Sequence, residues 1–166
     1  MPTRLQNGLV AATLDAEMVA VSTAGERRLA ASDFFQGAMT TALKPDELLA
    51  EARLPILPAN IRFGFAEFSR RAGDFAVAMA LAVLDVEEDV ITSARIGVGG
   101  AEAIPRRVAE AEAVLRGEGP GDAAWRAAAA AAAAAIDPLY DTLTDAQYRR
   151  ELVEAMVYRA LRQICV

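Results

Sequence analysis

The chain has 166 residues, no histidine, a single cysteine and a formal net charge of −6. Without histidine there is no Ser-His-Asp or Cys-His arrangement and no imidazole metal ligand, and one cysteine excludes an internal disulfide and a four-cysteine metal site. The acidic balance argues against a nucleic-acid partner, and neither a membrane span nor a signal peptide is recognisable, so we expect a cytoplasmic protein.

The first third of the chain predicts a helix followed by a small sheet. Residues 5–14 have apolar residues at roughly helical spacing. Residues 17–22 alternate as a strand does, and residues 27–31 can return as the hairpin partner. Ser32 is expected to cap one helical turn over residues 32–35.

An extended segment, residues 47–54, is followed by the clearest break in the chain. Pro55 and Pro58 interrupt any regular element and make this stretch the best candidate for a domain boundary. We therefore expect one unit over residues 1–57 and a second over residues 61–166.

The second unit begins with strands. A strand around Phe65 leads into a charged turn, and residues 75–84 then alternate strictly between large apolar residues and alanines. Period two indicates a strand, and apolar residues on both sides indicate that both of its faces are covered. Residues 85–89 are predicted to form an acidic hairpin turn, and residues 90–98 the partner strand.

Helices are predicted for the remainder: residues 108–115, with Pro105 just before the start, then residues 122–136 and 144–164. Trp125 is interpreted as a packing anchor in an alanine-rich helix. The sequence from Thr144 to Gln147 resembles a capping box for the last helix. The apolar stripe of that helix comprises Leu152, Val153, Met156, Val157, Ala160, Leu161 and Ile164.

The charged turn carries the first candidate chemistry. Arg70, Arg71 and Asp74 could meet a phosphate, a flavin edge or a partner subunit, or could simply pair with one another. Arg106 and Arg107 are either held for a partner or solvated.

Other candidate motifs have structural interpretations. The glycines of residues 97–100 lack the spacing of a nucleotide-binding loop and are interpreted as a strand end. The segments 137–141 and 148–151 offer carboxylates and phenols but are expected to be exposed. We therefore predict no catalytic residues.

The order of these motifs resembles the FAD-carrying medium subunit of molybdenum hydroxylases, the carbon monoxide dehydrogenase and xanthine dehydrogenase family. The segments that carry the likeness are Leu14-Asp-Ala-Glu-Met-Val, Asp33-Phe-Phe-Gln-Gly, Ile104-Pro-Arg and Tyr148-Arg-Arg-Glu-Leu. The resemblance implies an α+β fold: the remnant of a flavin subdomain, then a three-stranded antiparallel sheet packed on a three-helix bundle.

The resemblance also implies FAD as cofactor. The family's two glycine-rich pyrophosphate-binding segments lie upstream of everything matched here, so the chain is expected to be a truncated or split electron-transfer subunit that cannot hold FAD alone. By the same resemblance, residual flavin contacts fall near Leu49, Glu67 and Asp74.

The implied partners are a molybdopterin-binding large subunit and an iron–sulfur small subunit, with Arg70, Arg71, Arg106 and Arg107 as interface residues. The alternatives are a non-catalytic docking module for those subunits, or a shortened reading frame without a function of its own. Homo-oligomerisation stays open.

Overall fold

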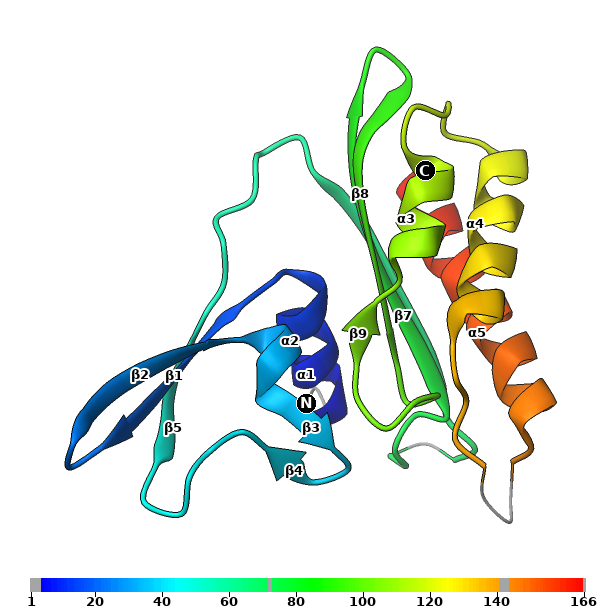
Figure 1. Ribbon diagram of the computed structural model, residues 1–166. Helices are drawn as coiled ribbons and strands as arrows, with labels where there is room; N and C mark the ends of the chain where they lie inside the picture. The colour runs from blue at the N-terminus through cyan, green and yellow to red at the C-terminus, as the bar shows by residue number, and fades with distance from the viewer. Residues whose placement is uncertain (1–3, 72, 141–143, 166) are drawn as a thin grey trace.

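The computed structural model describes residues 4–71, 73–140 and 144–165. Its strands form a three-stranded sheet in the order β2-β1-β5, a two-stranded sheet β3-β4, and a four-stranded sheet in the order β6-β7-β8-β9. We call the three-stranded sheet the first sheet and the four-stranded sheet the second sheet. Helices α3, α4 and α5 lie on one side of the second sheet, and the first sheet with α1 and α2 lies on the other (Figure 1).

The N-terminal elements follow the predicted order. Helix α1 spans Arg4–Thr13, and the antiparallel first sheet consists of β1 (Glu17–Ser22), β2 (Gly25–Ala30) and β5 (Leu48–Arg53). Between β2 and β5 lie α2 (Ala31–Phe34), β3 (Phe35–Gly37) and β4 (Thr40–Thr41). The predicted cap of the short helix was wrong: Ser32 lies inside α2, and Ala30 precedes the helix without a side-chain cap.

The second sheet contains the three long strands that were expected: β6 (Arg62–Phe68), β7 (Ala78–Glu87) and β8 (Val90–Gly99). β7 begins three residues later than the alternation suggested. The hairpin turn is shorter than predicted and consists of Glu88 and Asp89, whose φ values are positive, 48° and 61°. Two consecutive positive φ values are the geometry of a tight hairpin turn.

A fourth strand was missed. Arg106–Arg107 is β9, which pairs with Gly97 and Val98 of β8. The helix that follows, α3 (Ala109–Leu115), begins one residue later than predicted.

Both faces of β7 are covered, as its alternation predicts. Ala78, Ala80 and Ala82 belong to the core beneath the helices, whereas Met79, Leu81 and Val83 pack with Leu9 of α1 on the other face. Helix α1 therefore covers a face of the second sheet although it precedes the predicted boundary, and the partition into 1–57 and 61–166 stays a prediction.

The remaining helices are α4 (Asp122–Ala135), α5 (Ala146–Arg162) and the short η1 (Gln163–Cys165). Trp125 is 2% exposed within the helix–sheet core, which confirms it as a packing anchor. Every residue of the predicted apolar stripe of α5 is buried. The N-cap of α5 lies one residue later than predicted: Asp145 precedes the helix, and its Oδ1 accepts a hydrogen bond of 2.7 Å from the backbone N–H of Tyr148.

None of the described helices is long and apolar enough to cross a membrane.

Candidate functional site

The charged turn after β6 is exposed. Arg70, Arg71 and Asp74 all face solvent, and the backbone N–H of Asp74 donates to the carbonyl of Arg71 at 3.1 Å. Within the described parts of the chain, none of these three side chains forms an ion pair, so the alternative in which they pair with one another is not observed. Ala72, in the middle of the turn, lies outside the described residues.

Glu67 lies near the end of β6, at the mouth of an open hollow. The hollow has a volume of about 410 Å³ and is lined by Ala66, Glu67, Arg159, Arg162 and Gln163. The carboxylate of Glu67 accepts a hydrogen bond of 2.6 Å from Nε2 of Gln6 in α1. Glu67 is thus oriented by the N-terminal helix, beside two exposed arginines of α5.

Leu49 lies elsewhere. It is 42% exposed on β5 of the first sheet, opposite Ala20 of β1. The structure therefore places the three predicted flavin contacts on three elements: Leu49 on β5, Glu67 on β6 and Asp74 in the loop before β7. No single described pocket contains all of them.

The partly buried guanidinium of Arg106 forms its hydrogen bonds with groups of the same chain. Its Nε donates to Oε2 of Glu102 at 2.8 Å, and its Nη2 donates to the carbonyl of Ala135 at 2.8 Å. The last carbonyls of a helix lack intrahelical donors, so a guanidinium at this end satisfies them. Its position is explained by stabilisation of the C-terminal end of α4.

Arg107 is the centre of a larger polar network. It donates to both oxygens of Glu112, at 2.8 and 2.6 Å, and to Oδ2 of Asp15 at 2.6 Å. Glu112 is 4% exposed and also accepts from the backbone N–H of Ile96. The hydrogen bond to Glu112 is the main cause of a raised pKa for Arg107, so its guanidinium stays protonated throughout the physiological range. Through Asp15 and Glu112, this network joins the turn after α1 to β9 and α3.

Arg149 is a buried arginine that the sequence did not reveal. The segment 148–151 was expected to be exposed, but Arg149 is 6% exposed and donates to the carbonyls of Val77 and Gly100, at 3.2 and 2.9 Å. These acceptors are far away in sequence, so no local pattern could have identified them. Tyr140 is exposed as predicted, and Asp141 lies outside the described residues.

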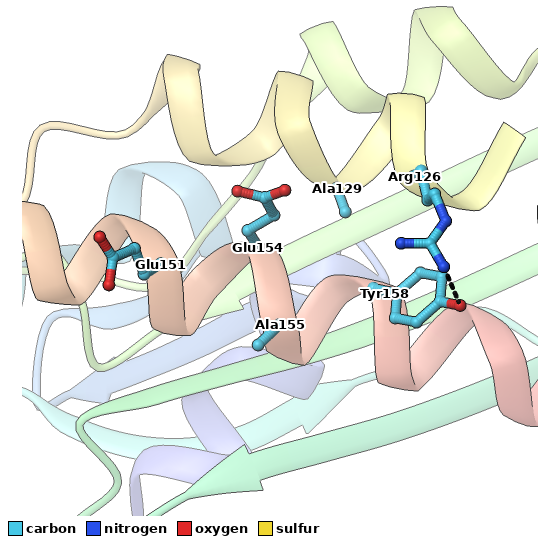
Figure 2. Close-up of a pocket in the computed structure, with 6 residues that line it drawn as sticks. All are labelled: Arg126, Ala129, Glu151, Glu154, Ala155 and Tyr158. Carbon is cyan, nitrogen blue, oxygen red and sulfur yellow. Dashed lines mark hydrogen bonds between the residues drawn. The ribbon is translucent and has the colours of Figure 1, made fainter. Parts of the chain in front are cut away.

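A second hollow lies between α4 and α5. Figure 2 shows it lined by Arg126, Ala129, Glu151, Glu154, Ala155 and Tyr158, and its volume is about 210 Å³. The Tyr158 hydroxyl donates to Asp122, and Arg126 donates to both Asp122 and the Tyr158 oxygen. The Tyr158 hydrogen bond, and then that of Arg126, lower the pKa of Asp122. The polar groups at this end of the hollow thus satisfy one another.

The expected absence of a cradle for the pyrophosphate of a dinucleotide stays a prediction. Such a cradle needs backbone N–H groups that converge at a glycine-rich turn or a helix N-terminus. Gly97 is instead a packing position within β8, since a Cβ there would overlap the side chain of Thr13 in α1. Gly121 precedes α4, but Asp122 in the first turn disfavours an anion. In the described chain, no group of His, Cys, Asp or Glu side chains could hold a metal ion either.

Two family models match the chain in succession. Residues 8–57 match the FAD binding domain in molybdopterin dehydrogenase, and residues 63–164 match the CO dehydrogenase flavoprotein C-terminal domain.

Curated relatives extend the similarity. The nicotine 6-hydroxylase medium subunit of Paenarthrobacter nicotinovorans is 33% identical over 153 residues, which cover 92% of this chain and 53% of the relative. The carbon monoxide dehydrogenase medium chain of Afipia carboxidovorans is 34% identical over 139 residues, covering 84% of this chain and 48% of the relative.

Solved structures agree with the fold. Quinoline 2-oxidoreductase from Pseudomonas putida 86 superposes with a TM-score of 0.88 and 31% identity, covering 95% of this chain and 54% of the other. CO dehydrogenase from Oligotropha carboxidovorans gives a TM-score of 0.88 with 32% identity, covering 95% and 55%. The predicted α+β fold class is confirmed.

The fold and the two consecutive matches define the class as a flavoprotein segment of the molybdopterin-dependent dehydrogenases. The chain belongs to the CO dehydrogenase flavoprotein C-terminal domain family, and it is homologous to the FAD-binding medium subunits of CO dehydrogenase and other molybdenum hydroxylases. It spans about half the length of the curated relatives that it matches.

Proposed function

We propose that this chain forms part of an FAD-carrying electron-transfer subunit in a molybdenum hydroxylase. The observation that carries the proposal is the succession of the two family models, a flavin-binding one and then the C-terminal one, along a chain that superposes on such enzymes over 95% of its length. Assembly with a molybdopterin-binding large subunit and an iron–sulfur small subunit in the cytoplasm belongs to the same proposal.

FAD retention by this chain requires, on this proposal, a second polypeptide segment. On this proposal Leu49 and Glu67 would contact the flavin edge, and the support for a second segment is that Gly97 of β8 packs against Thr13 of α1 and is not available to a phosphate. When bound, FAD would supply the electron-carrying chemistry. The described residues would contribute the second sheet and the carboxylate of Glu67, which accepts a hydrogen bond from Gln6.

The first experiment measures flavin retention. The purified 166-residue chain is incubated with FAD, passed through gel filtration and examined by absorbance. We expect no stoichiometric flavin in the protein peak, and retention when the chain is co-expressed with the unmatched half of the Paenarthrobacter nicotinovorans medium subunit. A stoichiometric flavin spectrum from the chain alone would contradict the requirement for a second segment.

A second candidate function is a docking module without catalysis. It is favoured by the exposed Arg70 and Arg71, which have no ion-pair partner among the described residues. Co-expression with the large and small subunits of a relative separates the two functions. Flavin-dependent dye reduction by the complex supports electron transfer, whereas a stable complex without that activity supports docking alone.

A further inference from the structure

The arginines of this acidic chain differ in whether they have partners. Most of the described guanidiniums are held by carboxylates or by backbone carbonyls, as with Arg27, Arg53 and Arg150. The arginines whose side chains are exposed and meet neither kind of acceptor among the described residues are Arg62, Arg70, Arg71, Arg116, Arg159 and Arg162. All of these except Arg116 lie on β6, in the turn after it, or near the C-terminal end of α5.

These elements form one edge of the second sheet. β6 is the edge strand, and α5 lies along it: the Tyr148 ring meets the Phe68 ring edge-on at 6.5 Å. Toward the other end, the side-chain amide of Gln163 accepts from the backbone N–H of Phe65 and donates to its carbonyl, at 3.1 and 2.8 Å. Apart from Arg116, the unpaired arginines therefore lie at this edge of the sheet, which we call the β6 edge.

Among the described residues, the carboxylates near this edge form no ion pair with its arginines: Asp74 lies in the same turn, and Asp85 accepts a hydrogen bond from Asn60. Glu67 lines the hollow with Arg159 and Arg162, but its carboxylate accepts from Gln6. The guanidinium of Arg162 lies 5.8 Å from the centre of the Tyr158 ring, a cation–π contact that leaves its positive charge in place. In a chain of net charge −6, with carboxylates available elsewhere for Arg28, Arg106 and Arg126, such a cluster is an exception to the general pairing.

We propose that the β6 edge docks a carboxylate-rich segment of a partner polypeptide. The positive charges are distributed along a seven-residue strand, or about 20 Å, and continue into the turn that follows. A single phosphate needs donors that converge on one point, whereas several carboxylates along an extended segment match charges spread over this length. Arg106 and Arg107 do not belong to this surface, because their guanidiniums are held by Glu102 and Glu112.

The inference does not depend on FAD binding and stands if the proposed electron-transfer role fails. Its test uses the purified 166-residue chain and a fluorescent decaglutamate peptide as the probe, with fluorescence anisotropy as the readout. We expect saturable binding that weakens as salt is added, because exposed charge pairs are screened. The double variant Arg159→Gln/Arg162→Gln should bind about fivefold more weakly, since each exposed pair contributes a modest free energy.

The chain offers a matched control in Arg116→Gln, which removes an exposed, unpaired arginine from another part of the surface. This variant should bind the peptide like the parent, and circular dichroism verifies that all variants are folded. Absence of peptide binding by the parent, or equal weakening by Arg116→Gln, would overturn the proposal. Displacement of the peptide by inorganic phosphate beyond the effect of sodium chloride at equal ionic strength would also overturn it, in favour of a small oxyanion site.

Discussion

The two main sheets differ in how completely their faces and edges are covered. The second sheet is packed against α3, α4 and α5 on one face and against α1 on the other, and its central strand β7 is buried from Ala78 to Leu84. In the first sheet, every residue of the edge strand β5 is exposed, including Leu48 at 76%. Because apolar burial is the main favourable term in folding, the stability of the chain resides in the second sheet and its helices.

Ion pairs connect neighbouring strands on the surface of the first sheet. Arg28 meets Glu17 and Glu26, and Arg53 meets Glu17 and Glu51, in each case between side chains that are about half exposed. Each exposed pair of this kind contributes little to the free energy of unfolding, so these pairs stabilise the first sheet less than apolar packing stabilises the alanine-lined core. The comparison thus separates a region stabilised by close packing from one held largely by hydrogen bonds and charges.

Replacement of Trp125 should give the largest effect. Trp125→Ala removes a side chain that is 2% exposed in the core under the helices, and such truncations cost about 3–5 kcal/mol. Leu48→Ala on β5 is the matched control and should change the free energy of unfolding by less than about 0.5 kcal/mol. Urea unfolding followed by circular dichroism measures both. Equal losses would mean that the two regions do not differ in the way their burial suggests.

A smaller effect is expected where the two regions meet. A Cβ on Gly97 of β8 would overlap Thr13 of α1, whose buried hydroxyl donates to the carbonyl of Leu9. Gly97→Ala should therefore displace α1 and cost about 1–3 kcal/mol, as overpacking generally does. In Gly37→Ala the new methyl group would meet Thr40 at 3.8 Å, an ordinary contact, so this variant serves as the control. If Gly97→Ala unfolds at the same urea concentration as the parent, the close contact between α1 and β8 does not limit stability.

The smallest effect is expected on the stability of the chain at acidic pH. In the first sheet, Arg27 donates to both oxygens of Glu47, and the backbone N–H of Lys44 adds a third hydrogen bond. These contacts, the Arg27 hydrogen bond first, lower the pKa of Glu47 to about 2, from about 4.3 in an unfolded chain.

The unfolded state thus binds the proton more readily. The contribution of Glu47 is present above pH of about 4.3 and is lost as the pH falls toward about 2. Glu47→Gln should flatten the dependence of unfolding free energy on pH in this window, as measured by urea unfolding at a series of pH values. An unaltered pH profile in Glu47→Gln would show that the native contacts do not hold the carboxylate ionised.

Period-two and helical patterns predicted most elements because burial imposes them locally. The alternation over residues 75–84 identified β7 and its two covered faces, and the stripe from Leu152 to Ile164 identified α5. β9 was missed because two residues carry no periodicity, and their pairing with Gly97 and Val98 follows from the chain path.

The candidate site was less predictable than the fold. The pairing of Arg106 and Arg107 depends on acceptors such as Asp15 and Ala135, which tertiary structure alone brings near. The burial of Arg149 likewise depends on the carbonyls of Val77 and Gly100. Arg70 and Arg71 are exposed, and their expected role at a partner interface stays a prediction.

The position of α1 has a consequence for recombining relatives of this chain. A chimera joined in the proline-rich stretch near Leu57 would take α1 from one parent and the sheet that α1 covers from the other. Leu9 and Thr13 would then meet a foreign β7 and β8, at a contact where a glycine and a threonine fit each other closely. Exchange of flavin-binding segments between medium subunits should therefore keep α1 with the C-terminal sheet of the same parent and make the junction before α1.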